Sequence, residues 1–377
     1  VVVSLYKEDF PEGIWGNGMR ITDLEEEYLG ESMSVIYLPN HQSRVDYIVE
    51  HILSRRYQLA DPMVIAGDNL NVAVFGKILK GFGAIFIQRS FNDEVYTERN
   101  LANFIEFTLL NKIPFEVYIE GTRSRDGKLL LPKYGILKTL SNIYLKQREI
   151  DDNISFDMRF VPMSITYERI YEADGYLREL MGKDKKQEST AKIFKNGVTE
   201  LMGSQPEFDF KAFVKEAQRN KGDYDNSTKK LLGKIFVKLG NTFKLSQFVE
   251  DDLKSTNIPL EMIPGSNINL KKLGFTVLHE INRARYLPEI SIIGSAIQTH
   301  FNMYKKCRFA ISELMPIFKV LLQTFEREEE KCNNISNVSH LNNLLSLSDS
   351  DKILLVKQQI PLFFRAVKVN FLTDEIV

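Results

Sequence analysis

The fold is decided by the stretch Val35-Ile-Tyr-Leu-Pro-Asn-His-Gln-Ser-Arg-Val-Asp46. Its apolar run 35–38 predicts a buried strand that ends at Pro39. His41 comes just after that strand end, and Asp46 closes a Ser-x-x-acid pattern typical of a helix start. A histidine with a carboxylate one turn further on can serve as a general base and its orienting partner. By itself, however, the pair is better explained as a structural histidine beside a helix-capping carboxylate.

Short apolar runs alternate with helical patterns from residue 34 to about residue 166. The predicted strands are 35–38, 63–66, 84–88, 115–119 and 160–165. The predicted helices are 44–55, 71–80, 94–110 and 136–145. Strands that alternate with helices predict an α/β fold, with a central, largely parallel mixed sheet flanked by helices. Functional residues are then expected to collect at the strand ends.

Beyond residue 166, the sequence predicts one further strand and then helices. The strand, at 233–239, would return to the sheet, and a linker with prolines follows near 251–269. The predicted helical segments are 190–201, 210–218, 273–285, 288–300, 309–327 and 351–367. The charged and then Asn- and Ser-rich stretch 326–340 is expected to be an exposed connection.

These patterns divide the chain into four parts. We expect an N-terminal extension at 1–33, an α/β domain at 34–250, the linker at 251–269 and a helical, incomplete C-terminal region at 270–377. Because the chain does not begin with Met and its first residues do not resemble a signal peptide, we read it as a fragment or a processed form.

Composition narrows the class of protein. The 49 Lys and Arg residues nearly balance the 50 Asp and Glu residues, so overall charge does not support nucleic-acid binding and an anion site must be a local basic cluster. Two cysteines in unrelated contexts, Cys307 and Cys332, argue against a disulfide framework or a cysteine zinc site and fit a reducing compartment. No stretch approaches the ~20 uninterrupted apolar residues of a simple membrane-spanning helix.

Two further stretches place notable residues at predicted strands. Gly83-Ala-Ile-Phe-Ile-Gln-Arg89 ends in Arg89, which is either a surface arginine or a phosphate ligand at the same sheet edge as His41. In Val161-Pro-Met-Ser-Ile-Thr166, Pro162 lacks an N–H and is therefore expected at the start or edge of a strand. A structural role explains Pro162 best, although it could also shape a slot for an apolar substrate chain.

The stretch Glu120-Gly-Thr-Arg-Ser-Arg125 is the richest in hydrogen-bonding side chains. Gly121 permits tight backbone geometry, while Thr122 and Ser124 offer hydroxyls and nearby amides. The forked guanidinium donors of Arg123 and Arg125 suit a phosphate group, and Lys133 adds positive charge. A polar turn with solvated arginines is the alternative interpretation.

In chain order, the four stretches 35–46, 83–89, 120–125 and 161–166 resemble blocks I to IV of the glycerolipid acyltransferases, whose signature is the His-x-x-x-x-Asp of the first block. Other stretches are similar to one branch, the glycerol-3-phosphate and dihydroxyacetone-phosphate acyltransferases. These stretches are Ala66-Gly-Asp-Asn-Leu70, Leu131-Pro-Lys133, Gly182-Lys-Asp-Lys-Lys-Gln-Glu-Ser189, 237–248 and His279-Glu-Ile-Asn-Arg-Ala-Arg285. The resemblance covers roughly residues 34–300. Gln42 and Gln88 depart from it, since the branch often has Arg at both positions.

The resemblance implies that His41, oriented by Asp46, deprotonates the primary hydroxyl of a phosphorylated three-carbon acceptor. The oxygen would attack an acyl thioester, either acyl-CoA or acyl-carrier protein, and glycerol 3-phosphate would become lysophosphatidate. No metal, no cofactor beyond this co-substrate and no covalent enzyme intermediate are implied. The other implied roles are phosphate binding by Arg89, Arg123, Arg125 and Lys133, shaping of the acceptor site by Glu120 and Gly121, and proximity to the acyl donor for Pro162.

Several alternatives stay open. Dihydroxyacetone phosphate could be the acceptor, because it also has a primary hydroxyl and a phosphate. A non-catalytic lipid- or phosphate-binding protein could keep the same fold, although such a protein would not need His41 and Asp46. A metal hydrolase is less favoured, since the five histidines show no His-Glu-x-x-His spacing.

Membrane contact is expected from the chemistry, because the donor chain and the product are both amphiphilic. We expect a peripheral protein at a cytoplasmic or organellar membrane, using apolar and basic surface that can include the C-terminal helices.

Overall fold

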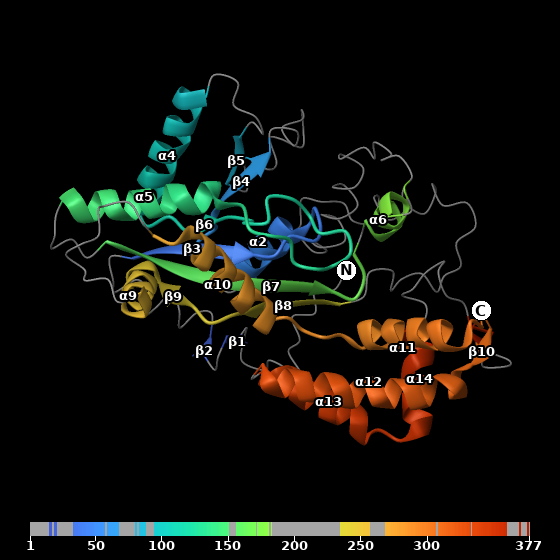
Figure 1. Cartoon of the computed structure of the whole chain (residues 1–377). Helices are drawn as coiled ribbons and strands as arrows, with labels where there is room; N and C mark the ends of the chain where they lie inside the picture. Colours follow the sequence, from blue (N-terminus) through green and yellow to red (C-terminus); the bar gives the residue numbers. More distant parts are fainter. Residues whose placement is uncertain are drawn as a thin grey trace.

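The computed structural model in Figure 1 describes part of the chain. The described residues are 15–16, 19–20, 33–56, 59–67, 80, 83–87, 94–150, 156–170, 172–180, 182, 234–256, 268–306, 308–332, 334–359, 369–370 and 375–376. The predicted helices at 190–201 and 210–218, and all but the last residue of the helix predicted at 71–80, lie outside these ranges.

A seven-stranded sheet forms the centre of the molecule, with the order β5-β4-β6-β3-β7-β8 and β9 paired with β7. Its strands are β3 (Met33–Pro39), β4 (Met63–Gly67), β5 (Ala84–Ile87), β6 (Phe115–Glu116), β7 (Asp157–Tyr167), β8 (Ile235–Leu239) and β9 (Phe243–Lys244). The strands from β5 to β7 pair in parallel, whereas β8 and β9 run antiparallel to β7. This arrangement confirms the predicted α/β fold with a largely parallel mixed sheet.

β3 is buried along its whole length because it lies between β6 and β7. Val35 and Tyr37 pack into the apolar cluster on one face of the sheet, and Ile36 and Leu38 pack into the cluster on the other face. A strand covered on both faces has an uninterrupted apolar sequence, which is why the run 35–38 shows no polar alternation.

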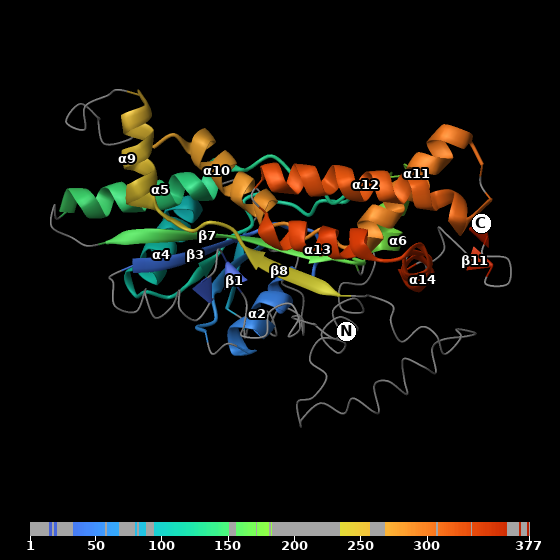
Figure 2. The ribbon, with the colours of Figure 1, turned by 90° about the horizontal axis from the view of Figure 1, so that it is seen from below.

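Helices cover both faces of the sheet. On one face, α2 (Asp46–Arg56) packs Ile48, Val49 and Leu53 against β3, β7 and β8. The other face is covered by α4 (Glu94–Leu110), α5 (Tyr134–Ile150), α9 (Leu245–Thr256) and α10 (Leu270–Arg283). Figure 2 shows α2 across the sheet from α5, α9 and α10.

Helix α9 was not predicted. The strand predicted at 233–239 is β8 and ends at Leu239, but a linker was expected from residue 251, where α9 continues to Thr256. The helix forms because Leu245 and Phe248 bury their side chains in the same cluster as α10. Residues 257–267 lie outside the described part of the chain.

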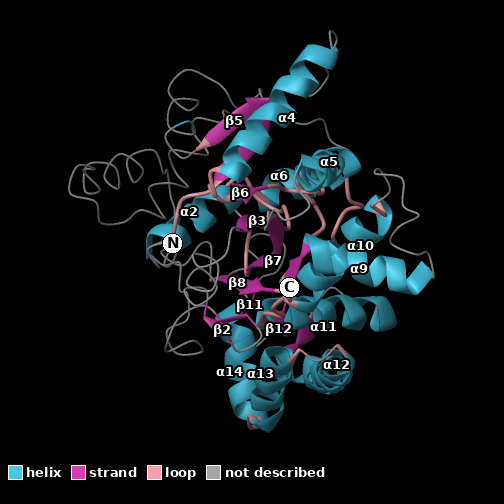
Figure 3. Cartoon of the chain, turned by 90° about the vertical axis from the view of Figure 1, so that its left-hand side faces the viewer, coloured by secondary structure: helices cyan, strands magenta, loops and turns pink. Residues whose placement is uncertain are grey.

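The C-terminal region is helical, as predicted. Its helices are α11 (Glu289–Tyr304), α12 (Ile311–Lys331), α13 (Ile335–Ser346) and α14 (Asp349–Gln359), and they share a third apolar cluster. Figure 3 shows α12, α13 and α14 at the opposite end of the molecule from α4. Short strands accompany the larger elements, namely β1 (Trp15–Gly16), β2 (Met19–Arg20), β10 (Phe309–Ala310), β11 (Val369–Asn370) and β12 (Glu375–Ile376).

The prediction that residues 326–340 form an exposed connection is wrong. Most of this stretch belongs to the end of α12 and the start of α13. Leu341 and Leu344 are buried and Val338, three residues earlier, is partly buried, so α13 has a narrow apolar stripe that the surrounding Asn and Ser residues conceal. Among the described helices, none combines the length and apolarity needed to cross a bilayer.

Candidate active site

The loop that carries His41 is held at the end of β3 by Asn40. The backbone N–H of Asn40 donates to the carbonyl of Met163 at 3.1 Å. Its side chain accepts from the N–H of Ile165 at 2.6 Å and donates to the carbonyl of Ile165 at 3.1 Å. Asn40 therefore continues the pairing of β3 with β7 by one residue and fixes the point from which His41 projects.

His41 and Asp46 form a direct hydrogen-bonded pair. Nδ1 of His41 lies 2.8 Å from Oδ2 of Asp46, whose side chain is completely buried, whereas the His41 side chain is 22% exposed. A carboxylate accepts only, so Nδ1 carries the proton and the neutral ring keeps its lone pair on Nε2. Among the described residues, none forms a hydrogen bond with this nitrogen, which can therefore accept a proton from a substrate.

Asp46 also caps the helix that it begins. Its Oδ2 accepts from the backbone N–H groups of Gln42 at 2.8 Å and Ser43 at 2.9 Å, and its Oδ1 accepts from the hydroxyl of Tyr167. The hydroxyl of Ser43 accepts in turn from the N–H of Val45 at 3.3 Å. The capping role and the orienting role therefore coexist in one carboxylate, because each uses different donors.

The loop 120–125 is tied to the backbone of His41. The N–H of His41 donates to Oε1 of Glu120 at 2.8 Å, and the carbonyl of His41 accepts from the N–H of Ser124 at 2.8 Å. Oε2 of Glu120 accepts from the N–H of Leu130 at 2.7 Å. The ring of Tyr118 lies against the imidazole, with 4.3 Å between centroids. The carboxyl ends of β3 and β6 thus meet at one edge, as the parallel sheet requires.

Gly121 has a positive φ of +67°, which an L side chain rarely adopts. A Cβ at this position would lie 3.0 Å from Cγ of Lys133, whose aliphatic stem covers the turn. The N–H of Lys133 donates to the carbonyl of Ile119 at 2.6 Å. Glycine is therefore needed both for the turn itself and for the approach of Lys133.

The two arginines of the loop already have acidic partners, which the sequence did not predict. Nη1 of Arg123 donates to Glu172 at 3.0 Å and to the hydroxyl of Tyr176 at 2.8 Å. Nε of Arg125 donates to Glu179 at 3.2 Å. The loop is therefore a set of ion pairs facing α6 (Ala173–Leu180) rather than a cluster of unpaired cations.

Glu172 joins this loop to the His41 segment. Besides Arg123, it accepts from the hydroxyl of Ser43 at 2.7 Å and from the N–H of Arg44 at 2.8 Å. Tyr176 adds a second tie, donating to the carbonyl of Gln42 at 2.9 Å. Burial, followed by the charge of Glu172, raises the pKa of Tyr176, which keeps its hydroxyl protonated as a donor.

The other predicted site residues have varied positions. The two hydroxyls of the loop already form hydrogen bonds within it or next to it. Thr122 accepts from Nη1 of Arg125 at 3.3 Å, and Ser124 donates to Asp126 at 3.2 Å. Pro162 is buried in the middle of β7, so the expectation of a strand start or edge is wrong. Arg89 lies outside the described residues.

Pro162 fits the middle of β7 because its neighbour is interrupted there. Its carbonyl accepts from the N–H of Gly240 at 2.8 Å, on the side where β8 ends and β9 has not begun. The residues of β7 on either side of Pro162 pair with those two strands in turn. The missing N–H therefore leaves no acceptor of a regular ladder unsatisfied.

Arg285, from the C-terminal region, reaches the same side of the molecule. Its Nη2 donates to the carbonyl of Gly127, two residues beyond the loop. The carbonyl of Arg285 is held by the side-chain amides of Asn334 at 3.1 Å and Asn337 at 2.7 Å. The helical region thereby supports the segment that follows the loop.

Comparisons with known proteins point to one class. Residues 20–166 match the family described as Acyltransferase, and this stretch includes His41, Asp46 and the loop 120–125. The chain is 29% identical over 288 residues to the glycerol-3-phosphate acyltransferase of Pseudomonas fluorescens (strain SBW25), covering 74% of this chain and 30% of that protein. It is 28% identical over 316 residues to the enzymes of the same name from Pseudomonas putida (strain GB-1) and Ectopseudomonas mendocina, covering 81% of this chain and 34% of each. The chain thus spans about a third of the length of these relatives.

Proposed function

Because residues 20–166 match the acyltransferase family, we propose that the chain moves a fatty acyl group from an acyl thioester to the sn-1 hydroxyl of glycerol 3-phosphate. The observation that carries this proposal is the hydrogen-bonded pair of His41 and Asp46 next to the two arginines of the loop 120–125. The names of the relatives support the choice of acceptor.

In the proposed reaction, Nε2 of His41 takes the proton of the acceptor hydroxyl as its oxygen attacks the thioester carbonyl carbon. The tetrahedral intermediate collapses, the C–S bond breaks, and the imidazolium returns the proton to the thiolate. Asp46 stabilises the imidazolium while it exists, because its buried carboxylate lies 2.8 Å from Nδ1. The donor would be acyl-CoA or acyl-carrier protein, and the products are lysophosphatidate and a free thiol.

The acceptor phosphate would bind at Arg123 and Arg125, with Lys133 and Arg89 as further candidates. Both hydrogen bonds of Arg123 to Glu172 and Tyr176 use Nη1, so its Nε and Nη2 face no competition from those partners. The Arg125–Glu179 pair is the more accessible of the two ion pairs, with side chains 29% and 27% exposed. A phosphate would therefore displace Glu179 more easily than Glu172.

Replacing Glu179 by glutamine is expected to lower the KM for the acceptor about two- to fivefold with little change in kcat. The reason is that a partly exposed ion pair contributes roughly 0.2–1 kcal/mol, which the phosphate no longer has to overcome at Arg125. Steady-state kinetics with varied acceptor would measure the change. Glu328→Gln removes one member of an exposed ion pair on α12 and is the matched control. A rise in KM would show that Glu179 assists acceptor binding.

The experiment that tests the function is acyl transfer from palmitoyl-CoA to radiolabelled acceptor by the purified chain. Glycerol 3-phosphate and dihydroxyacetone phosphate are compared side by side, because the same residues would serve either. Product from glycerol 3-phosphate is expected. Product from dihydroxyacetone phosphate alone would move the chain to the alternative acceptor. Failure with both, and with an acyl-carrier-protein donor and added lipid, would favour a non-catalytic binding protein.

Peripheral membrane contact is part of the proposal. The end of α11 exposes Phe301, Met303 and Tyr304 by 43%, 61% and 54%, and Lys305 and Lys306 follow directly. Apolar side chains beside basic residues favour an anionic membrane surface. Replacing the three apolar residues by serine is expected to reduce co-sedimentation with anionic phospholipid vesicles severalfold. Unchanged sedimentation would remove α11 from the membrane contact.

A further inference from the structure

Buried polar side chains lie between α2 and β6, beside the apolar contact that α2 makes with β3, β7 and β8. Along β6 and the residues after it, Phe115, Val117 and Ile119 pack into the apolar cluster on the α5 side. The alternate residues belong to the opposite side, because successive side chains of an extended segment point to opposite faces. Those residues are Glu116 and Tyr118, after which the chain turns. Polar side chains thus occupy a helix–sheet interface that is normally apolar.

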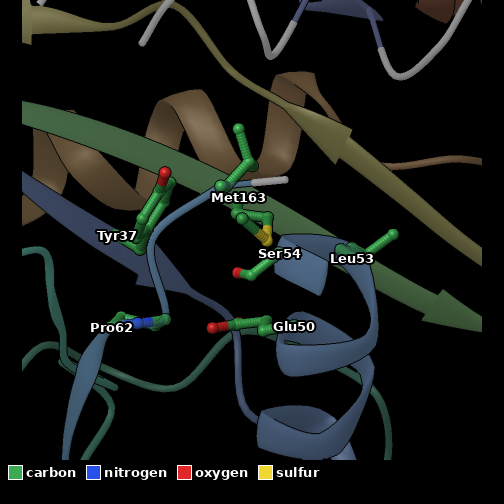
Figure 4. A pocket seen from close by; sticks show the side chains of 7 residues that line it. Tyr37, Glu50, Leu53, Ser54, Pro62 and Met163 are labelled. Carbon is green, nitrogen blue, oxygen red and sulfur yellow. The ribbon is translucent and has the colours of Figure 1, made fainter. Parts of the chain in front are cut away.

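Glu50 of α2 meets Glu116 in this layer. It lies one helical turn after Asp46, on the same face of the helix. The side chains of Glu50 and Glu116 are 3% and 0% exposed. Figure 4 shows Glu50 reaching from α2 toward Pro62, into a small pocket also lined by Tyr37 and Met163.

The two carboxyl groups are unsatisfied as carboxylates. None of their four oxygens has a well-formed hydrogen bond with a described residue, and neither group forms an ion pair with a described lysine or arginine. Two adjacent buried carboxylates cannot both ionise without a large electrostatic cost, whereas one proton between them supplies the missing donor. Burial and the neighbouring Glu116 raise the pKa of Glu50 well above its usual range, and burial raises the pKa of Glu116.

We propose that Glu50 and Glu116 share one proton and act together as positioning residues for His41. The pair carries one negative charge next to Tyr118, whose ring centroid lies 4.3 Å from that of the His41 imidazole. This inference rests on the proposed function for its effect on catalysis, but the shared proton can be tested without activity.

The surroundings of the pair are consistent with a single retained proton. The charged and titratable groups that face it are Asp46 and His51 on α2, Tyr118 after β6 and Tyr167 on β7. Burial and then Glu116 raise the pKa of Tyr118, and burial and then Asp46 raise the pKa of Tyr167, so both tyrosines stay neutral. Asp46 adds a second negative charge, which further opposes ionisation of both glutamates.

The first test compares the stability of the wild-type chain with Glu50→Gln as a function of pH. A folded-state pKa above the unfolded value of about 4.3 gives stability that is present at low pH and lost as the pH rises toward the folded value. Glutamine removes this loss, because its amide donates to Glu116 without titrating. We therefore divide the unfolding equilibrium constant of the wild type by that of the variant at each pH. This ratio is expected to rise by up to tenfold per pH unit above pH ~5, because only the wild type loses stability. A ratio that stays constant between pH 5 and 8 would overturn the shared proton, and Glu116→Gln provides the same test from the other partner.

The second test uses the pH dependence of kcat/KM, whose acidic limb reports the essential base of the free enzyme. Each single glutamine variant keeps one negative charge, so its acidic limb is expected to match that of the wild type. Glu50→Gln/Glu116→Gln removes the charge and should move the limb by about half a unit to lower pH, because a nearby negative charge favours an imidazolium. An unmoved limb would overturn the positioning role. Inactive wild type would instead count against the proposed function, while the stability test would still decide the shared proton.

Discussion

Replacing His41 by alanine is expected to lower kcat for acyl transfer by about 10²- to 10⁴-fold, the contribution typical of a positioned general base. The imidazole is the group that can take the hydroxyl proton, since its Nδ1 is bonded to Asp46 and its Nε2 has no hydrogen-bond partner in the described part of the chain. The fold should survive, because the side chain is partly exposed and the loop is held by backbone hydrogen bonds to Glu120 and Ser124.

The measurement is initial-rate acyl transfer with both substrates saturating, alongside circular dichroism to confirm folding. His279→Ala is the matched control, because it removes an exposed imidazole from α10 and is expected to leave kcat unchanged. A His41→Ala enzyme within fivefold of wild type would rule out general-base catalysis by this residue. KM for the acceptor should change little, since the proposed phosphate ligands remain.

Replacing Asp46 by asparagine has the second largest expected effect, and it should affect both catalysis and stability. The carboxylate accepts from His41, Gln42, Ser43 and Tyr167, whereas an amide has one acceptor oxygen and one donor nitrogen. If the amide nitrogen faces His41, Nδ1 must accept its hydrogen bond, and the ring proton then sits on Nε2. In this tautomer Nε2 can no longer act as the base. We expect kcat to fall by about 10²-fold or more.

The same substitution leaves buried donors unpaired at the start of α2. A buried donor without a partner costs about 1–3 kcal/mol, so the free energy of unfolding should fall by at least that amount. Chemical denaturation measures this loss, and Asp252→Asn, which disrupts an ion pair with Lys272, is the control. If the stability fell but kcat remained unchanged, Asp46 would be a helix cap without a catalytic role.

The sequence was sufficient for the centre of the fold because its signals there are local. The run 35–38 predicted β3. The spacing of His41 and Asp46 alone favoured a structural histidine beside a helix cap, whereas the resemblance implied a pair, which the structure joins at 2.8 Å. Helix α13 was missed, because Asn and Ser residues surround a narrow apolar stripe. The position of Pro162 was missed because the gap between β8 and β9 is a property of strands distant in sequence.

The partners of the loop arginines could not be predicted for a similar reason. Glu172 and Glu179 lie about 50 residues after Arg123 and Arg125, and their only local signal is the helical spacing of Glu172, Tyr176 and Glu179. The pairing of Glu50 with Glu116 likewise depends on the packing of α2 against β6. The sequence identified the arginines of the loop as candidate phosphate ligands, whereas only the tertiary structure shows that their charges are already paired with carboxylates.

Helix α10 has a consequence for how the molecule unfolds. Leu273, Val277 and Ile281 are buried in the same apolar cluster as Ile36 and Leu38 of the central strand, although more than 200 residues separate them. Contacts of such long range form late in folding and are lost together. The sheet and α10 should therefore melt in a single cooperative transition. A protease that cuts between α9 and α10 would leave two pieces that remain associated until that transition.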